Sequence, residues 1–231
     1  MSEIIGLIGA MDEEIKLLLE SMEDKVSTVK AGVAYYSGTI FGQRVVLCKS
    51  GVGKVNAAVT TQILIDAFGA ARVLFTGVAG AVHPELGIGD IVISSHCIQH
   101  DMDVTALGYP RGVIPYQEVS SFPADPALVQ LAEAACRALK QKSVTGVVLS
   151  GDQFIASAAV VAELREQLDG ACAEMEGAAV AQVCYMNGIP FVIIRSMSDK
   201  ADGSAHVNYR EFTVTASERS HAILEYMLKA M

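Results

Sequence analysis

Four carboxylates of this chain lie in or beside its most apolar segments, where an ionised group is costly unless it is paired or hydrogen-bonded. Glu174 and Glu176 lie within one apolar run late in the sequence, and Asp199 ends the next one. Glu14 follows the first apolar run of the chain. Two carboxyl groups whose surroundings push their pKa values apart can act as general acid and general base at neutral pH. The pattern therefore indicates acid/base chemistry, which we expect to act on a polyhydroxylated, heteroaromatic substrate.

Each of these acids also has an explanation that involves no function. The helix dipole favours an acid such as Glu14 in the first turn of a helix, and Asp199 would suit the cap of a turn that follows it. Glu174 would suit a solvated position before a helix. Glu176 fits such an explanation poorly, because the small apolar residues at 177–181 behind it predict close packing. We therefore interpret Glu176 and Asp199 as the strongest functional candidates.

The elements that must position these acids can be predicted from the apolar runs. Short runs typical of buried strands alternate with longer runs typical of helices, which predicts an α/β fold with a largely parallel sheet buried on both faces. The predicted strands are 4–10, 35–40, 44–49, 72–76, 90–98, 144–150 and 190–196. The predicted helices are 12–22, 55–68, 127–140, 158–167, 176–186 and 211–228. Residues 105–125, rich in Gly, Pro and Tyr, are expected to form a long functional or flexible loop.

Ligands of open α/β sheets bind beyond the carboxyl ends of the strands. Glycines, acids, hydroxyls and one aromatic side chain follow the predicted strands, at 9–14, 50–54, 77–80, 150–155 and 196–199. Glycine lets the backbone approach a ligand closely, and Phe154 offers a stacking face. Each segment alone is a weak signal, and their expected convergence at one rim of the sheet is what indicates a binding site.

The composition excludes several classes of protein. A hydrophobic fraction of 52% with 19% charged residues suits a deeply buried sheet or an oligomer, and it argues against disorder. The net charge of -9 argues against binding to a nucleic-acid backbone, which needs clustered Lys and Arg. No apolar run reaches the ~18 residues of a membrane span, and the N-terminus lacks the basic start of a signal peptide. The five cysteines are odd in number and scattered, which predicts reduced thiols in a cytoplasmic protein.

Motifs for cofactors and metals are absent or incomplete. Residues 51–54 are spaced too closely for a phosphate-binding P-loop, and residues 6–11 lack the glycine fingerprint of dinucleotide-binding proteins. The His and Asp residues within 96–103 could be drawn as metal ligands. Side chains alternate between the two faces of a strand, so these residues are not expected to converge. We therefore predict no metal and no cofactor, and with no linker or repeat in view we expect one domain over 1–231.

Across nearly the whole chain, the sequence resembles the bacterial 5′-methylthioadenosine/S-adenosylhomocysteine nucleosidases of the nucleoside phosphorylase superfamily. The matching segments occur in family order, at 9–14, 50–55, 77–80, 89–92, 100–106, 150–155, 174–176 and 196–202. The resemblance implies a three-layer α/β domain whose mixed central sheet partly closes and is flanked by helices. It also implies a homodimer that hydrolyses the bond between adenine N9 and ribose C1′ in small-molecule adenine nucleosides carrying a 5′ substituent. The implied substrates are 5′-methylthioadenosine and S-adenosylhomocysteine, with 5′-deoxyadenosine as a further one.

The resemblance implies roles for individual residues. Asp199 would protonate adenine N7, with Ser198 holding its carboxyl group. Glu14 would position and deprotonate the attacking water, with Arg195 and Glu176 nearby, and Glu176 would also bind the ribose hydroxyls. The other substrate-binding candidates are Met11, Val52, Val78, Gly80, Phe154, Ile155, Glu174, Met175 and Tyr209. Three more would come from the partner subunit to enclose the 5′ substituent: Val104, Leu107 and Pro115.

Three alternative functions are compatible with the same fold. A nucleoside phosphorylase needs cationic groups for phosphate, whereas the corresponding places hold residues 10–12 and Thr76, and Glu14 would repel phosphate. A catalytically silent nucleoside-binding protein has no use for acids at 14, 176 and 199. A nucleosidase that acts mainly on aminodeoxyfutalosine shares these motifs, so it stays open as an alternative.

Overall fold

The computed structural model describes residues 3–201 and 205–231, with side chains described for 3–201 and 212–231. Its strands are β1 Ile4–Gly9, β2 Glu23–Lys30, β3 Val33–Ile40, β4 Gln43–Lys49, β5 Ala70–Ala81, β6 Ile91–Gln99, β7 Ser121–Pro123, β8 Ser143–Ser150, β9 Gly170–Glu174 and β10 Phe191–Asp199. Its helices are α1 Asp12–Glu20, α2 Lys54–Phe68, α3 Pro126–Ala138, α4 Ala158–Leu168, α5 Gly177–Asn187 and α6 Ala205–Ala230, with a 3-10 turn at Thr105–Leu107.

The strands form one sheet, part of which closes on itself. From β5, hydrogen-bonded neighbours run through β10, β6, β8 and β9, and β9 returns to β5. The other edge of β5 pairs with β1, and the sheet continues through β4 and β3 to β2. Of the pairings between described strands, five are parallel and five antiparallel. The sheet is therefore mixed and partly closed, as the family resemblance implied, and the expectation of a largely parallel sheet was wrong.

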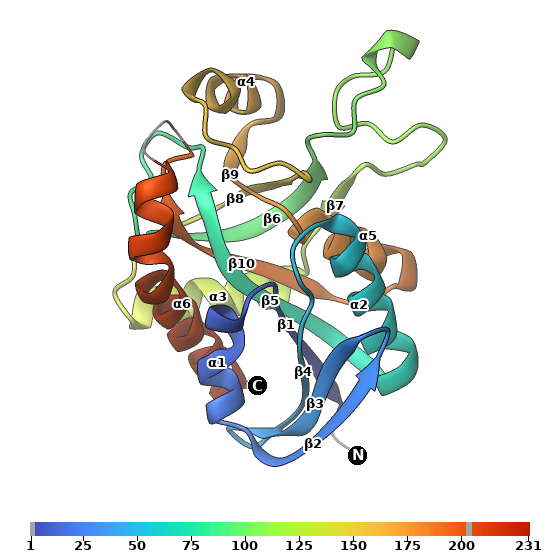
Figure 1. The fold of residues 1–231 in the computed structure, drawn as a ribbon, viewed down its shortest axis with the longest axis vertical. Coiled ribbons are helices and arrows are strands. Elements are labelled where there is room, and N and C mark those ends of the chain that lie inside the picture. Colours follow the sequence, from blue (N-terminus) through green and yellow to red (C-terminus); the bar gives the residue numbers. More distant parts are fainter. Residues whose placement is uncertain (1–2, 202–204) are drawn as a thin grey trace.

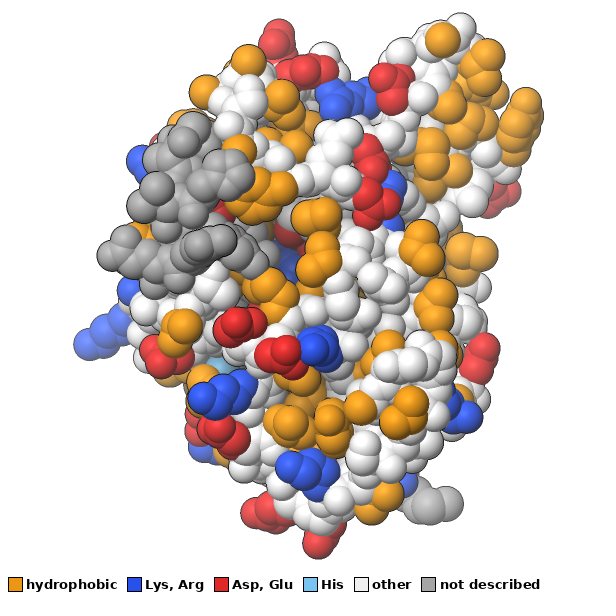
Figure 2. Space-filling model, viewed as in Figure 1, with side chains coloured by type: hydrophobic (Ala, Val, Ile, Leu, Met, Phe, Trp, Pro, Cys, Tyr) orange, Lys and Arg blue, Asp and Glu red, His pale blue; other side chains and the backbone are white. Residues whose placement is uncertain are grey.

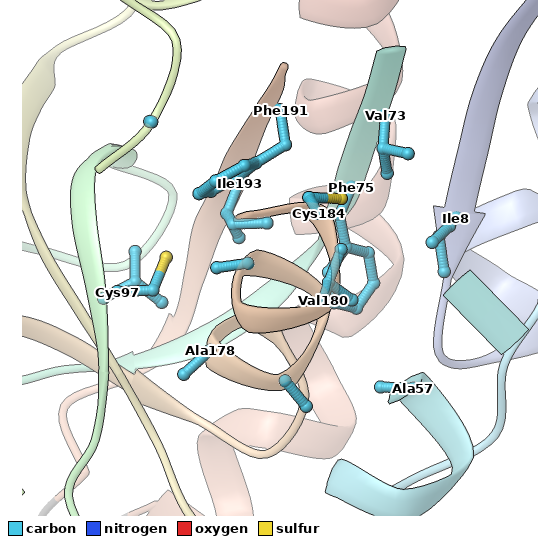
Figure 3. Packing of buried hydrophobic residues seen from close by; sticks show 14 of the residues in the cluster. Ile8, Ala57, Val73, Phe75, Cys97, Ala178, Val180, Cys184, Phe191 and Ile193 are labelled. Atoms are coloured by element: carbon cyan, nitrogen blue, oxygen red, sulfur yellow. The ribbon is translucent and has the colours of Figure 1, made fainter. Parts of the chain in front are cut away.

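Helices cover both faces of this sheet (Figure 1). α2 and α5 pack on one face, where Phe75, Val180 and Ile193 belong to the same apolar core (Figure 3). α1, α3 and α6 cover the opposite face around a second core that includes Leu18 and Leu224. α4 packs on a third, smaller cluster beside β8 and β9. The architecture confirms the predicted fold class, a mixed α/β fold with a central sheet flanked by helices.

Local sequence explains where the covering helices begin and how they pack. α3 begins at Pro126, which suits the first helical position, and the Asp125 carboxylate accepts the Leu128 N–H at 2.9 Å as an N-cap. α5 has no polar face over 177–181, because it lies between the sheet and α2 and those residues are buried all round. Small side chains at 177–179 let this helix approach the sheet closely.

Three strands, β2, β7 and β9, were not predicted. Every residue of β2 is exposed, so this edge strand lacks the alternation of apolar and polar residues by which strands are recognised. β9 consists of five buried residues, mostly small, and runs without a break into the segment that continues as α5. β7 has three residues and lies at the end of the predicted loop. Two rim segments were also misplaced: 77–80 lie inside β5 and 196–199 inside β10, rather than after shorter strands.

Candidate active site

Glu14 is placed by a tight turn between β1 and α1. The turn needs glycine at Gly9, because a Cβ there would come within 3.0 Å of the Glu14 Cβ. The Glu14 carboxylate is buried and accepts three backbone N–H groups, from Ala10 at 2.6 Å, Met11 at 3.0 Å and Val78 at 2.9 Å. β1 pairs with β5 only as far as Phe75, so the N–H of Val78 beyond that point is free to bind Glu14.

Arg195 lies beside Glu14 in the interior of the sheet. It is fully buried on β10 and is the largest fully buried side chain in the described part of the chain. Its guanidinium forms an ion pair with Glu174, lies 3.7 Å from Glu176, and stacks 4.0 Å above the ring centre of Phe75. Its Nε and Nη1 atoms have no hydrogen-bond acceptor among the described residues. The buried guanidinium of Arg195 therefore holds Glu174 and Glu176 close together. Its Nε and Nη1 atoms can still donate hydrogen bonds to another group.

Gly77 on β5 makes this close arrangement sterically feasible. A Cβ added at Gly77 would lie 2.1 Å from the Nη1 atom of Arg195 and 2.4 Å from the Oε1 atom of Glu14. Both functional groups therefore lie side by side over a strand position that has no side chain. A buried N–H donor next to a buried carboxylate is suited to hold a polar molecule the size of water.

Glu174 occupies a structural position at the start of α5. Its carboxylate accepts the Gly177 N–H at 2.9 and 2.8 Å and the Glu176 N–H at 3.2 Å, and it also accepts the hydroxyl of Ser150. Negative charge at a helix N-terminus is favourable. With the ion pair to Arg195, these contacts satisfy most of its acceptor capacity. Glu174 does line the cavity described below, but its predicted contact with substrate stays a prediction.

Burial raises the pKa values of the two carboxyls that face Arg195. For Glu14, burial raises the pKa, and the opposite effects of Arg195 and of the three backbone N–H groups are smaller. For Glu176, burial and the charge of Glu174 raise the pKa to about 8, against the opposing effects of Arg195 and the Gly53 N–H. Glu14, Glu174 and Glu176 thus lie around one buried guanidinium, and burial disfavours the ionised forms of Glu14 and Glu176.

Asp199 reaches the same cavity from the end of β10. The pairing of β10 with β5 shifts register between Met197 and Asp199, and a bulge of this kind re-aims side chains. Ser198 and Asp199 consequently both line the cavity, and the Ser198 hydroxyl donates to the Asp199 carboxylate at 2.9 Å. The other carboxylate oxygen accepts the Ala201 N–H at 2.7 Å. Gly80 leaves room for this arrangement, because a Cβ there would come within 2.9 Å of Asp199.

These groups surround one cavity of about 260 Å³ at the closed end of the sheet. Twelve of the seventeen predicted site residues line it: Met11, Glu14, Val52, Val78, Gly80, Phe154, Ile155, Glu174, Met175, Glu176, Ser198 and Asp199. Arg195 lies behind the lining, against Glu174 and Glu176. Tyr209 lies outside the residues whose side chains the structure describes. Val104, Leu107 and Pro115 lie away from the cavity, on the segment between β6 and β7.

Some functional positions were missed by the sequence analysis. The remaining lining residues are Ala10, Ala79, Gln153 and Ala173. Ala10, Ala79 and Gln153 fall in segments already expected at the rim, and the two alanines have no polar group that could have singled them out. The backbone N–H groups that hold Glu14 leave no mark in the sequence at all, because every residue except proline has one. Among the described residues, no group of three or more His, Cys, Asp or Glu side chains is arranged to hold a metal ion.

Fold and site together define a class: a mixed α/β protein with buried carboxylates around a cavity at the closed end of its sheet. Residues 4–229 match the model of the phosphorylase superfamily, and the chain belongs to this superfamily. The 5′-methylthioadenosine/S-adenosylhomocysteine nucleosidase of Halalkalibacterium halodurans is 43% identical over 217 residues, which cover 94% of each chain. That of Anoxybacillus flavithermus is 41% identical over 229 residues, 98% of each chain.

A solved structure supports the same relationship. The 5′-methylthioadenosine/S-adenosylhomocysteine nucleosidase from Neisseria meningitidis, in complex with methylthio-immucillin-A, matches with a TM-score of 0.95 and 39% identity. The match covers 99% of this chain and 100% of that one. The resemblance inferred from the sequence motifs is thereby confirmed.

Proposed function

We propose that this protein hydrolyses the N-glycosidic bond of 5′-methylthioadenosine and S-adenosylhomocysteine, and of 5′-deoxyadenosine as a further substrate. The products are adenine and the 5′-substituted ribose. The observation that carries the proposal is that two buried carboxylates, Glu14 and Asp199, face one cavity and belong to separate hydrogen-bond networks. The names of the relatives, at more than 40% identity over nearly the whole chain, support the same activity.

Asp199 is the proposed general acid. Adenine leaves poorly as an anion, so a carboxylic acid must protonate N7 or donate strongly to it. Asp199 is buried at the cavity wall, with Ser198 and the Ala201 N–H fixing its two oxygens. Phe154 and Ile155 line the same cavity, where they would stack on the base and pair with its edge.

Glu14 is the proposed base, with Arg195 and Glu176 beside it. As adenine leaves, ribose C1′ develops the positive charge of an oxocarbenium-like centre. Nearby carboxylates stabilise this charge, as in other glycoside hydrolyses. A water held between the unpaired Nη1 atom of Arg195 and the Glu14 carboxylate is positioned for attack. Because burial raises the pKa of Glu14, this carboxylate is a stronger base than an exposed one. Glu176 would accept the ribose hydroxyls, and Met175 would pack against the sugar.

Phosphorolysis is the less well supported alternative. The lining of the cavity contains no Lys or Arg among the described residues, and the guanidinium of Arg195 is committed to carboxylates.

A futalosine hydrolase of Helicobacter pylori matches this chain with a TM-score of 0.96 at 33% identity. Hydrolysis of aminodeoxyfutalosine therefore remains the second candidate activity.

We also propose a homodimer, because the residues expected around the 5′ substituent do not reach their own cavity. Val104, Leu107 and Pro115 lie on the segment that protrudes at the upper right of Figure 1, and hydrophobic side chains gather on it in Figure 2. Leu107 is 73% exposed and Tyr116 is 98% exposed. Large apolar side chains at this exposure indicate a surface that is covered in the assembly. A second copy of the chain is the proposed occupant.

The cytoplasm is the proposed location. All five cysteines are free and buried, as suits a reducing compartment. No helix of the described residues is long and apolar enough to cross a membrane.

The proposed activity is tested by following adenine release in buffer free of phosphate. We expect full turnover, with the free 5′-substituted sugar as product, from methylthioadenosine, S-adenosylhomocysteine and 5′-deoxyadenosine. Aminodeoxyfutalosine is assayed in parallel, since kcat/KM for the four substrates ranks the two candidate activities. Strict dependence on phosphate, with a sugar 1-phosphate as product, would contradict the hydrolase.

A further inference from the structure

The first turn of α2 lies between two carboxylates from distant parts of the chain. The Gly53 N–H donates to the Oε1 atom of Glu176 at 2.8 Å, on the cavity side. The next N–H, that of Lys54, donates to the Oδ1 atom of Asp152 at 2.8 Å, on the exposed side. Asp152 therefore helps to fix the position of the Gly53 N–H, which makes one of the few direct hydrogen bonds of Glu176. The groups that hold Asp152 in place thus also affect this hydrogen bond.

Asp101 ties this arrangement together from the end of β6. Its Oδ1 atom accepts the ammonium group of Lys54 at 2.6 Å, and its Oδ2 atom accepts the Asp152 N–H at 2.9 Å. Both side chains of the Lys54–Asp101 pair are 17% exposed, which separates the pair from the exposed ion pairs of the surface. Burial opposes ionisation of Asp101, but the bonds from Lys54 and Asp152 still lower its pKa below the ordinary value.

The backbone conformation at the start of α2 requires glycine at Gly53. Gly53 has a φ of 99°, a region open to glycine, and a Cβ there would lie 3.1 Å from the Oδ1 atom of Asp152. The segment that Asp101 holds through Asp152 also carries Phe154, which lines the cavity. Two walls of the cavity are therefore joined through one partly buried ion pair outside it.

We propose that Lys54, Asp101 and Asp152 form a positioning bracket that holds the Gly53 N–H against the Glu176 carboxylate and so fixes this carboxylate for the sugar hydroxyls. None of the three bracket residues lines the cavity. They act through Glu176, so the inference rests on the role proposed for that residue. The bracket keeps Glu176 oriented, and its hydrogen bond from Gly53 also favours the ionised form.

The test compares Lys54→Met with Lys54→Arg, since arginine can still pair with Asp101 whereas methionine cannot. Adenine release is measured with enzyme in excess, so that slow variants remain measurable. We expect Lys54→Met to lower kcat/KM about tenfold, which is the effect of weakening one hydrogen bond to a charged group. Lys54→Arg should restore most of the lost activity.

The acidic limb of the kcat/KM profile should move to higher pH in Lys54→Met, because the Gly53 N–H lowers the pKa of Glu176. Lys229→Met, which breaks an exposed ion pair of the same 2.6 Å length on α6, is the matched control and should change neither quantity.

A double-mutant cycle separates positioning from general stability. In a Glu176→Gln background, Lys54→Met should cost less than about twofold, because a bracket that acts through Glu176 has little left to position. An equal loss in both backgrounds, with an unmoved acidic limb, would overturn the proposal. Asp152→Ala, at an exposed residue, repeats the cycle if Lys54→Met does not fold. Absence of adenine release from the unmodified protein would instead refute the proposed function, so the two failures are distinguishable.

Discussion

At the scale of single residues, Asp199 faces the cavity from the end of β10, with one carboxylate oxygen held by the Ser198 hydroxyl and the other by the Ala201 N–H. We expect Asp199→Asn to reduce kcat by ~10²–10⁴-fold, because asparagine keeps a hydrogen bond but has no carboxylic proton to give. Substrate binding should persist, as measured by calorimetry under conditions where turnover is negligible. A loss of less than about tenfold would remove Asp199 from the role of general acid.

Glu14 and Glu13 are neighbours in the sequence but differ completely in their surroundings. Glu14 is buried with three N–H donors, whereas Glu13 is exposed on the first turn of α1. We expect Glu14→Gln to lower kcat by at least ~10²-fold and Glu13→Gln to remain active. Adenine release by folded protein checks both variants. Equal activity in the two variants would show that Glu14 is not the base that deprotonates the attacking water.

The raised pKa of Glu176 predicts how stability depends on pH. A carboxyl whose folded-state pKa is raised stabilises the fold fully below its unfolded pKa, and this contribution is lost as pH rises through the folded value, about 8 here. Glu176→Gln is neutral at every pH, so its melting temperature should fall less between about pH 5 and about pH 9 than that of the unmodified protein. Scanning calorimetry across this range is the measurement, and parallel curves would contradict it.

At the scale of elements, β5 provides the strand positions over which the site is built. Gly77→Ala would place a Cβ 2.1 Å from the guanidinium of Arg195 and 2.4 Å from the Glu14 carboxylate, so both buried groups would have to shift. We expect a loss of ~1–3 kcal/mol in the free energy of unfolding, together with loss of most activity. Chemical denaturation and adenine release measure the two effects.

Gly87→Ala is the control for that substitution. Its added Cβ would meet nothing closer than 3.8 Å, an ordinary contact distance to Asp90. Activity and stability near those of the unmodified protein are expected. If Gly77→Ala also kept normal activity and stability, the close packing of Arg195 and Glu14 over β5 would not be required for function.

At the scale of the whole molecule, the apolar surface over α2 is the feature that a single chain leaves unexplained. Val55 on α2 is 74% exposed and Met186 at the end of α5 is 71% exposed. We expect the protein to sediment at twice its chain mass of 24.4 kDa, and Val55→Asp to shift it toward the monomer with a loss of activity. Val214→Asp, at a residue 57% exposed on α6 over the opposite face of the sheet, should leave mass and activity unchanged. A monomeric, fully active protein would refute the homodimer.

Much of the fold could be predicted because apolar periodicity reports burial directly. The runs that became β1, β6, β8 and β10, and the helices α1 to α5, were located within a few residues, whereas α6 begins at Ala205, six residues before the predicted start. The edge strand β2 was not, because all its side chains are exposed and its pairing depends on backbone groups alone. Closure of the sheet through β9 was likewise beyond any local pattern, since five residues of β9 join two strands from distant parts of the chain.

By itself, the sequence determined which acids are available and which superfamily the chain resembles, since these depend on residue type and order. Only the tertiary structure showed which groups Glu174 and Glu176 each contact. The two are separated by one residue, yet Glu174 turns into the N-terminus of α5 and toward Arg195, while Glu176 accepts the Gly53 N–H. The physical reason is that pKa values and acceptor pairing are set through space, by burial, by a guanidinium from another strand, and by backbone N–H groups that every sequence contains.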